Sequence, residues 1–300
     1  MAQSNYASPQ QSRWVSFAGQ TVEIIYDSPE AQAVIEFLYQ YVQPDPQTAP
    51  QVQFRLFYDA PLFHFYRTDE LLYQGDNRAT LAGAMLGNMG YSLADKNVGG
   101  LFFHSAGLSW QGRGILLPGA SGAGKTTLTA WLVSRGFQYL SDEFIFIAPN
   151  SHTMQAFTRP LNLKLPARPV LKSVLDYEGH ADQILTDFHA DLVPPALLGC
   201  AKPGGTPPLK LILFPGYGAQ ADEFSWQELS KAQTGLQLMQ TVINARNLPQ
   251  HGFFQVTRLA KTVPAIKLRY GSFDQLGQQI ERYLESLPLL SDEMTDELGR

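Results

Sequence analysis

A glycine-rich stretch near the middle of the chain carries the residue types that hold a phosphate group. Residues 119–126 read Gly-Ala-Ser-Gly-Ala-Gly-Lys-Thr and match the pattern G-x-x-x-x-G-K-[ST] in full. The glycines let backbone N–H groups curl around an anion, the lysine reaches the β- and γ-phosphates, and the threonine hydroxyl can bind Mg²⁺. The stretch therefore predicts binding of ATP and Mg²⁺ through Gly119, Ala120, Ser121, Gly122, Ala123, Gly124, Lys125, Thr126 and Thr127.

Two adjacent acids follow this loop and could take part in phosphate chemistry. Asp142 and Glu143 come 17 and 18 residues after Lys125, directly behind the apolar segment 137–140. A carboxylate at a strand end can face a phosphate loop, where it can hold Mg²⁺, directly or through water, or act as a general base. The residues alone leave open which acid does which. We also expect the Lys125 ammonium to face solvent while the site is empty.

His104 is the one histidine with a suggestive place in the sequence. It lies 15 residues before Gly119, on a segment expected to pair with the strand that enters the phosphate loop. Pairing about the turn at 112–113 would bring its imidazole to the loop end of the sheet. The remaining histidines share no such spacing and are interpreted as structural, namely His64, His152, His180, His189 and His251.

Apolar patterning predicts the elements that must position these residues. Strands at 101–111 and 115–117 form a hairpin into the loop, and a helix at 126–134 leads out of it. This entry predicts an α/β fold with α+β tendency and a mixed rather than purely parallel sheet. Further strands are expected at 22–26, 54–58, 62–67, 137–140, 144–148, 209–214 and 265–270, and further helices at 29–41, 79–95, 167–177, 231–243, 248–260 and 273–287.

Composition shifts divide the chain into four segments. Residues 1–13 are polar and are expected to form a flexible tail, and residues 14–97 a small α+β lobe. Residues 98–288 are expected to form the core around the phosphate loop, and residues 289–300 an acidic tail.

Charge and cysteine content exclude several classes of partner. The 27 acidic residues outnumber the 22 basic ones, which argues against nucleic acid as the main partner. The single cysteine, Cys200, allows neither an internal disulfide nor a four-cysteine zinc site and fits a reducing compartment. No apolar run approaches the ~20 residues of a membrane helix, and the polar start has no apolar signal region. We therefore expect a cytoplasmic protein without a membrane span.

The order and spacing of these motifs resemble HPr kinase/phosphorylase and its relatives in the PEP-carboxykinase-like superfamily. In that family a His-Gly segment, a phosphate loop, an Arg-Gly pair and an Asp-Asp pair follow one another. The equivalents here, aligned without a gap, are His104-Ser105, residues 119–126, Arg135-Gly136 and Asp142-Glu143. The segments 116–119, 140–144, 158–161 and 263–270 are most similar to the subgroup called HprK-related kinases.

The resemblance implies a phosphate-loop kinase core of HPr kinase/PEP-carboxykinase type and a role for each residue. Asp142 would be the base for a hydroxyl acceptor, or share a proton with His104, while Glu143 would bind the metal beside Thr126. Arg159 matches an arginine of the family, and it or Lys164 could neutralise transition-state charge. Phe157 stands where the bifunctional enzymes carry a glutamate, which argues against phosphorylase activity and against HPr as the acceptor.

The sequence thus predicts transfer of the γ-phosphate of ATP to a hydroxyl of a peptide, protein or small molecule, and a homo-oligomer is possible. Two alternatives stay open: a nucleotide-binding regulatory or assembly module, and an NTPase that uses water. An ABC-type ATPase is disfavoured because no Leu-Ser-Gly-Gly-Gln-like signature occurs. We expect the acceptor to dock between the N-terminal lobe and the loop around 149–166.

Overall fold

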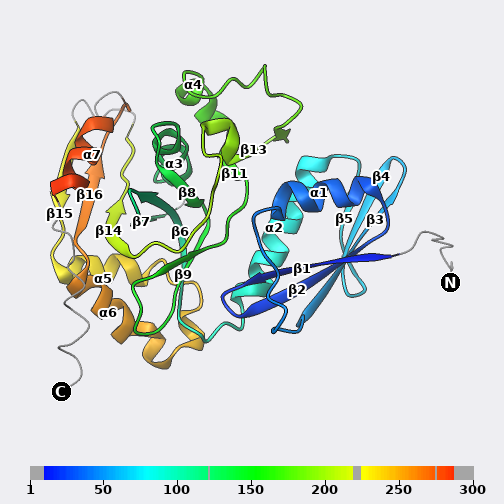
Figure 1. Ribbon diagram of the computed structural model, residues 1–300, viewed down its shortest axis with the longest axis horizontal. Helices are drawn as coiled ribbons and strands as arrows, with labels where there is room; N and C mark the ends of the chain where they lie inside the picture. Colours follow the sequence, from blue (N-terminus) through cyan, green and yellow to red (C-terminus); the bar gives the residue numbers. More distant parts are fainter. Residues whose placement is uncertain (1–9, 121, 219–223, 274–275, 287–300) are drawn as a thin grey trace.

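The computed structural model describes residues 10–120, 122–218, 224–273 and 276–286, which form two adjoining lobes (Figure 1). The first lobe contains a five-stranded sheet of order β1-β2-β3-β4-β5, in which only β2 and β3 run parallel. Its strands are β1 (Gln11–Phe17), β2 (Gln20–Tyr26), β3 (Val52–Asp59), β4 (Leu62–Arg67) and β5 (Glu70–Gly75).

Two helices cover this sheet, and each begins at a side chain that caps its first turn. Ser28 accepts a hydrogen bond from the Ala31 N–H before α1 (Pro29–Tyr39), and Asn77 accepts two before α2 (Arg78–Ala94). Their apolar faces pack on the sheet through buried residues, including Val34, Leu38, Leu81 and Met85. The expected strands and helices of this lobe are present.

One boundary of this lobe differs from the prediction. Strand β1 begins at Gln11, inside the segment expected to be a flexible tail, and pairs along its whole length with β2. The reason is that Val15 and Phe17 alternate with more polar neighbours and are buried, so the polar residues before them continue the same strand. The expected C-terminal tail, 289–300, lies outside the described residues.

The second lobe is built on a mixed sheet of order β10-β9-β6-β7-β14-β16-β15, with β8 also paired to β6. The hairpin of β6 (Leu101–Trp110) and β7 (Arg113–Pro118) is antiparallel, whereas β7, β14 (Leu209–Phe214) and β16 (Ala265–Arg269) run parallel. The α/β fold with a mixed sheet is therefore confirmed. The remaining strands are β8 (Gln138–Ser141), β9 (Phe144–Ile147), β10 (Met154–Ala156) and β15 (Ser225–Glu228).

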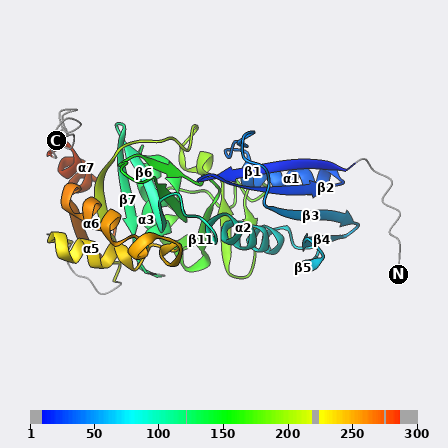
Figure 2. The same cartoon turned by 90° about the horizontal axis from the view of Figure 1, so that it is seen from below.

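Helices lie on both faces of this sheet (Figures 1 and 2). Helix α3 (Lys125–Ser134) packs on the face that buries Leu117 and Leu211, while α5 (Lys231–Met239) and α6 (Phe253–Thr262) pack on the face that buries Leu116 and Ile212. Helix α7 spans Gly277–Ser286, and a three-stranded sheet of β11 (Leu161–Lys164), β13 (Ala190–Val193) and β12 (Leu185–Thr186) stands beside α3.

The predicted helix at 167–177 is wrong. Only η1 (Leu165–Ala167) and α4 (Arg168–Leu171) form there, and residues 172–184 are mostly turns. Pro169 suits a first helical turn but provides no N–H to extend one, and no amphipathic stripe follows it. The helix expected at 248–260 begins at Phe253, because Gln250 and His251 adopt left-handed backbone angles inside η4 (Pro249–Gly252).

The two lobes share an apolar core. Phe102 of β6 and Phe157 belong to the same buried cluster as the first sheet, and the Phe17 ring lies 5.3 Å from each of their rings. The side chain of Asn97 reaches back to donate a hydrogen bond to the Ala18 carbonyl. The core is therefore continuous across the expected boundary at residues 97 and 98, and the division into independent domains stays a prediction. None of the helices in the described ranges is long and apolar enough to cross a bilayer.

Candidate functional site

The phosphate loop connects β7 to α3 and has backbone angles that require glycine. Gly122 and Gly124 have φ angles of 86° and 89°, which L residues with a side chain rarely adopt. A Cβ atom on Gly124 would also come within 2.9 Å of the Tyr270 hydroxyl. The first N–H groups of any helix have no partner within that helix, so the start of α3 can present donors to an anion. Ser121 lies outside the described residues.

Lys125 does not face solvent as expected. The residue is 7% exposed, and its Nζ donates hydrogen bonds to the carbonyl oxygens of Gly119, at 2.6 Å, and Ala120, at 3.2 Å. Burial lowers the pKa of Lys125, against the opposite effect of Glu143 and Asp142. The ammonium group is therefore held by two carbonyl groups of the phosphate loop and does not point into solvent.

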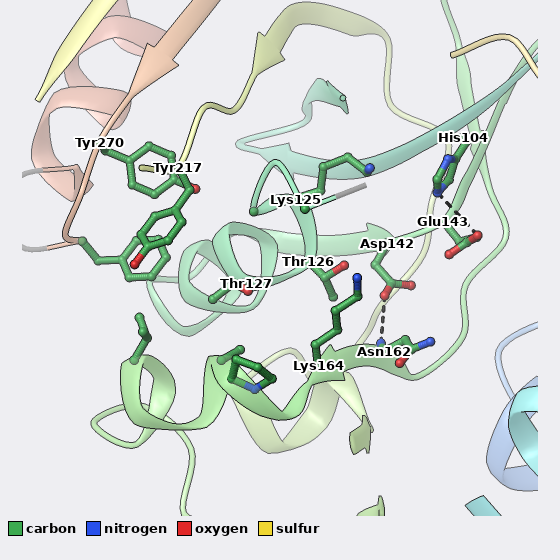
Figure 3. A pocket seen from close by; sticks show the side chains of 16 residues that line it. His104, Lys125, Thr126, Thr127, Asp142, Glu143, Asn162, Lys164, Tyr217 and Tyr270 are labelled. Atoms are coloured by element: carbon green, nitrogen blue, oxygen red, sulfur yellow. Dashed lines mark hydrogen bonds and ion pairs between the residues drawn. The ribbon is translucent and has the colours of Figure 1, made fainter. Parts of the chain in front are cut away.

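A cavity of about 330 Å³ opens on this loop and collects most of the predicted site residues (Figure 3). Its polar side is lined by His104, Gly122, Gly124, Lys125, Thr126, Thr127, Asp142, Glu143, Asn162 and Lys164. The hairpin explains the place of His104, because Ser105 pairs with Pro118 at the strand end that leads into the loop. Residues far apart in the sequence thus meet as the hairpin pattern predicts.

Asp142 is buried at the cavity wall and is held on both carboxylate oxygens. Oδ2 accepts a hydrogen bond from the Asn162 N–H at 2.8 Å, and Oδ1 accepts one from the Tyr139 hydroxyl at 3.2 Å. Its side chain is 1% exposed. Burial raises the pKa of Asp142, and the nearby Arg159 guanidinium opposes that rise. The carboxyl group is therefore fixed in orientation.

Glu143 is the more accessible of the two acids, with its side chain 33% exposed. Its Oε1 lies 3.5 Å from His104 Nε2, and its Oε2 accepts a hydrogen bond from Arg159 at 2.7 Å. Burial lowers the pKa of His104, and Lys125 and Arg159 lower it further against the pull of Glu143 and Asp142. These shifts favour the neutral imidazole, whose free nitrogen can accept a proton.

Arg159 contacts both acids, Asp142 and Glu143, but does not line this cavity. Its side chain is 5% exposed, and its Nε lies 3.4 Å from Asp142 Oδ1. Burial lowers the pKa of Arg159, but the two carboxylates outweigh burial and the pKa is raised overall. The buried guanidinium of Arg159 thus neutralises charge on both acids. Lys164, the other predicted cation, lines the cavity together with Lys125.

The far end of the cavity is apolar and aromatic, and no sequence motif predicted it. It is lined by Pro166, Ala167, Val170, Tyr217, Tyr270 and Phe273. The rings of Tyr217 and Tyr270 lie 5.8 Å apart, edge to face. The Tyr270 hydroxyl is buried and has no hydrogen-bond partner within the described part of the chain. These residues come from separate segments with no shared motif, so only the folded chain brings them together.

A second cavity of about 540 Å³ adjoins the first one. Glu143 and Asn162 line both cavities, and Arg159 lines the second. The other walls of the second cavity come from α2 and from the segment around η3 (Ala245–Asn247). The accessible carboxylate therefore stands between two separate spaces.

The donor set fits Mg²⁺ shared with phosphate oxygens better than a metal held by protein alone. Within the described ranges, no group of three or more His, Cys, Asp or Glu side chains is placed to hold a metal ion. Mg²⁺ characteristically takes one or two protein oxygens and completes its shell with water and substrate phosphates. Thr126 and the adjacent carboxylates provide oxygens of that kind at the edge of the phosphate loop.

Comparison with known proteins gives a distant structural likeness. No protein-family model matches the chain, and no curated protein matches it in sequence. Among solved structures, the chain is similar to the Hpr(Ser) kinase/phosphatase from Coxiella burnetii at 12% sequence identity, with a TM-score of 0.32. The match covers 61% of this chain and 88% of that one. A likeness this low carries no argument, so the functional inference rests on the residues of the site.

Proposed function

We propose that this protein is a kinase that transfers the terminal phosphoryl group of Mg-ATP to a hydroxyl group. The observation that carries the proposal is one cavity lined by Gly122, Gly124 and Lys125 of the phosphate loop together with two carboxylates and a histidine. Phosphoryl transfer needs these parts: donors for the phosphates, oxygens for a metal and a group that receives a proton.

The first cavity suits a nucleoside triphosphate along its length. Its phosphates would lie against the loop and the start of α3, with the Lys125 ammonium exchanging the Gly119 carbonyl for a phosphate oxygen. Lys164 adds a second positive charge on the opposite wall (Figure 3). The aromatic end beside Tyr217 and Tyr270 offers a nucleobase an apolar surface on which to stack.

We assign different tasks to the two acids. Asp142 and Thr126 line the same cavity, and these two would hold Mg²⁺, which in such sites neutralises charge on the transferred group. Glu143 lies beside His104 and would receive the proton, directly or by passing it to that imidazole. This division reverses the one that the family resemblance implies. It is favoured because Glu143 is the accessible acid and borders both cavities.

The transfer balances with the groups named. The acceptor oxygen bonds to the terminal phosphorus, and the bond from that phosphorus to the oxygen it shares with the β-phosphate breaks. ADP leaves with that electron pair, and the proton of the hydroxyl passes to Glu143. A carboxylate that accepts this proton contributes to the transfer step rather than to nucleotide binding.

ADP release tests the proposal against both alternatives. The full chain is incubated with Mg-ATP, with and without a mixture of serine peptides and small hydroxyl compounds. A kinase releases little ADP until an acceptor is present, an NTPase releases it in water alone, and a binding module releases none. Steady ADP release that no acceptor stimulates would contradict the kinase assignment.

A further inference from the structure

Tyr270 follows β16 directly, at the end of the parallel strands from which the phosphate loop also starts. Its N–H donates a hydrogen bond to the Gly216 carbonyl, and its own carbonyl accepts one from the Gly218 N–H. Its ring lies 5.8 Å from the Tyr217 ring and 5.6 Å from the Phe273 ring. The residue has no exposed surface, so its backbone and its ring are both held in place.

The hydroxyl group of this fixed ring is buried, and it has no hydrogen-bond partner among the residues that the structure describes. It lies against the phosphate loop, since a Cβ atom on Gly124 would come within 2.9 Å of it. Burial raises the pKa of Tyr270, so the hydroxyl keeps its proton and can act as a donor. A buried donor without a partner destabilises a fold, and an acceptor on a bound ligand would give this one a partner.

The position of Tyr270 along the first cavity indicates which part of a nucleotide it would meet. His104 and Glu143 stand at one end of this cavity, where the transferred group would react, and Tyr270 stands at the other end (Figure 3). Gly124 and the start of α3 lie beside Tyr270. A triphosphate that extends from the aromatic end toward Glu143 therefore brings its innermost phosphate, the one joined to the ribose, nearest to the hydroxyl.

We propose that the Tyr270 hydroxyl donates a hydrogen bond to the innermost phosphate of the nucleotide and so favours nucleotides over shorter inorganic phosphates. The inference rests on the proposed kinase function. In that function the Lys125 ammonium exchanges the Gly119 carbonyl for a phosphate oxygen. The loop beside Tyr270 thus changes its partners as the phosphates enter, and the hydroxyl gains its acceptor in the same step.

This contact would act on binding rather than on the transfer step. The innermost phosphate takes no part in the bond changes, so its hydrogen bond is the same in bound ATP, in the transition state and in bound ADP. An interaction of this kind lowers KM and leaves kcat unchanged. Tyr270 is therefore a residue that determines which phosphate compound binds, and its loss should affect KM alone.

The test uses the full chain and Tyr270→Phe, which removes one oxygen atom and keeps the ring. Tyr177→Phe is the matched control: the Tyr177 hydroxyl is also buried without a partner within the described ranges, and Tyr177 lines neither cavity. Calorimetry measures the affinities for ATP, ADP, inorganic triphosphate and pyrophosphate, each with Mg²⁺. The melting temperature is measured without ligand, and KM and kcat for ATP are measured with any acceptor that stimulates ADP release.

We expect Tyr270→Phe to weaken binding of ATP, ADP and inorganic triphosphate about tenfold or more, the effect of losing a hydrogen bond to a charged group. Pyrophosphate affinity, kcat and every value for the control should stay those of the wild type, and the melting temperature should not fall. Unchanged ATP affinity or a lower melting temperature in Tyr270→Phe would overturn the inference and leave the kinase proposal standing. Weaker ATP binding with unchanged binding of inorganic triphosphate would place the hydroxyl on the nucleoside instead, and equal weakening of pyrophosphate would overturn the selectivity. A wild-type chain that binds no Mg-ATP would overturn the kinase proposal itself.

Discussion

Lys125 donates hydrogen bonds to two carbonyl groups of the loop in which it is proposed to bind phosphate. Nucleotide binding therefore exchanges one set of partners for another, and the affinity measures the difference. Since the ammonium is buried, its removal also leaves the carbonyl oxygens of Gly119 and Ala120 without this donor.

Replacing Lys125 by alanine should weaken Mg-ATP binding by about tenfold or more, because a charge-assisted contact is worth roughly 1.5–3 kcal/mol. The melting temperature should also fall slightly, because two loop carbonyls lose their donor. Calorimetry measures the affinity, with Lys172→Ala, an exposed residue outside the cavity, as control. Unchanged affinity would contradict the phosphate-loop assignment.

The two acids should respond differently to loss of charge. Glu143→Gln should retain nucleotide binding and slow transfer by about 10²–10⁴-fold, the range for a lost general base. Asp142→Asn should instead weaken Mg²⁺ binding, so that transfer needs a higher Mg²⁺ concentration. Measuring the rate of ADP release as a function of Mg²⁺ concentration tests both expectations. If Asp142→Asn slowed transfer strongly while the Mg²⁺ dependence stayed that of the wild type, the base would be Asp142, as the family resemblance implies.

His104 gives the site a pH dependence of predictable sign. Because its pKa is lowered in the folded protein, the unfolded chain takes up this proton at higher pH than the folded chain does. Its contribution to stability is therefore complete above about pH 6.5 and is lost as the pH falls from there through the folded pKa. The acid limb of kcat should likewise lie below about pH 6.5. Loss of that limb in His104→Gln would support the assignment, and an unchanged profile would count against it.

Helix α2 contains three glycines, and replacing them by alanine should change the stability of the fold in opposite directions. Gly83→Ala and Gly87→Ala should each stabilise the fold by about 0.5–1 kcal/mol, since a Cβ meets nothing there. Gly90→Ala should destabilise it, because its Cβ would collide with the Phe144 ring. Scanning calorimetry of the three variants tests this contrast. Destabilisation by the first two would mean that packing requires those glycines after all.

Local sequence patterns predicted the elements that depend on local physics. The hairpin at 101–118 and the helix after the phosphate loop follow from apolar alternation and a turn, and the structure has both. Tyr217 and Tyr270 could not be foreseen, because their approach depends on the parallel placement of β7, β14 and β16. The short strands β11 to β13 were missed for a similar reason: each has only two to four residues, too few for a period to show.

For the whole molecule, the shared core predicts a single unfolding transition. Phe17 of the first lobe packs against the rings of Phe102 in β6, Phe146 in β9 and Phe157 directly after β10. These three residues belong to the second lobe. Phe17→Ala should cost about 3–5 kcal/mol and lower the melting temperature of the entire chain. Calorimetry shows whether one transition shifts as a whole. Two transitions, of which only one moved, would mean that the lobes unfold independently.

The position of Glu143 between two cavities has a kinetic consequence. In the proposed reaction the donor and the acceptor would reach Glu143 from separate cavities, so neither would need to depart before the other arrives. The group then passes directly between two molecules bound at once, without residing on the protein. Initial-rate plots at several fixed acceptor concentrations should give intersecting rather than parallel lines, and no labelled protein should accumulate when ATP is supplied alone.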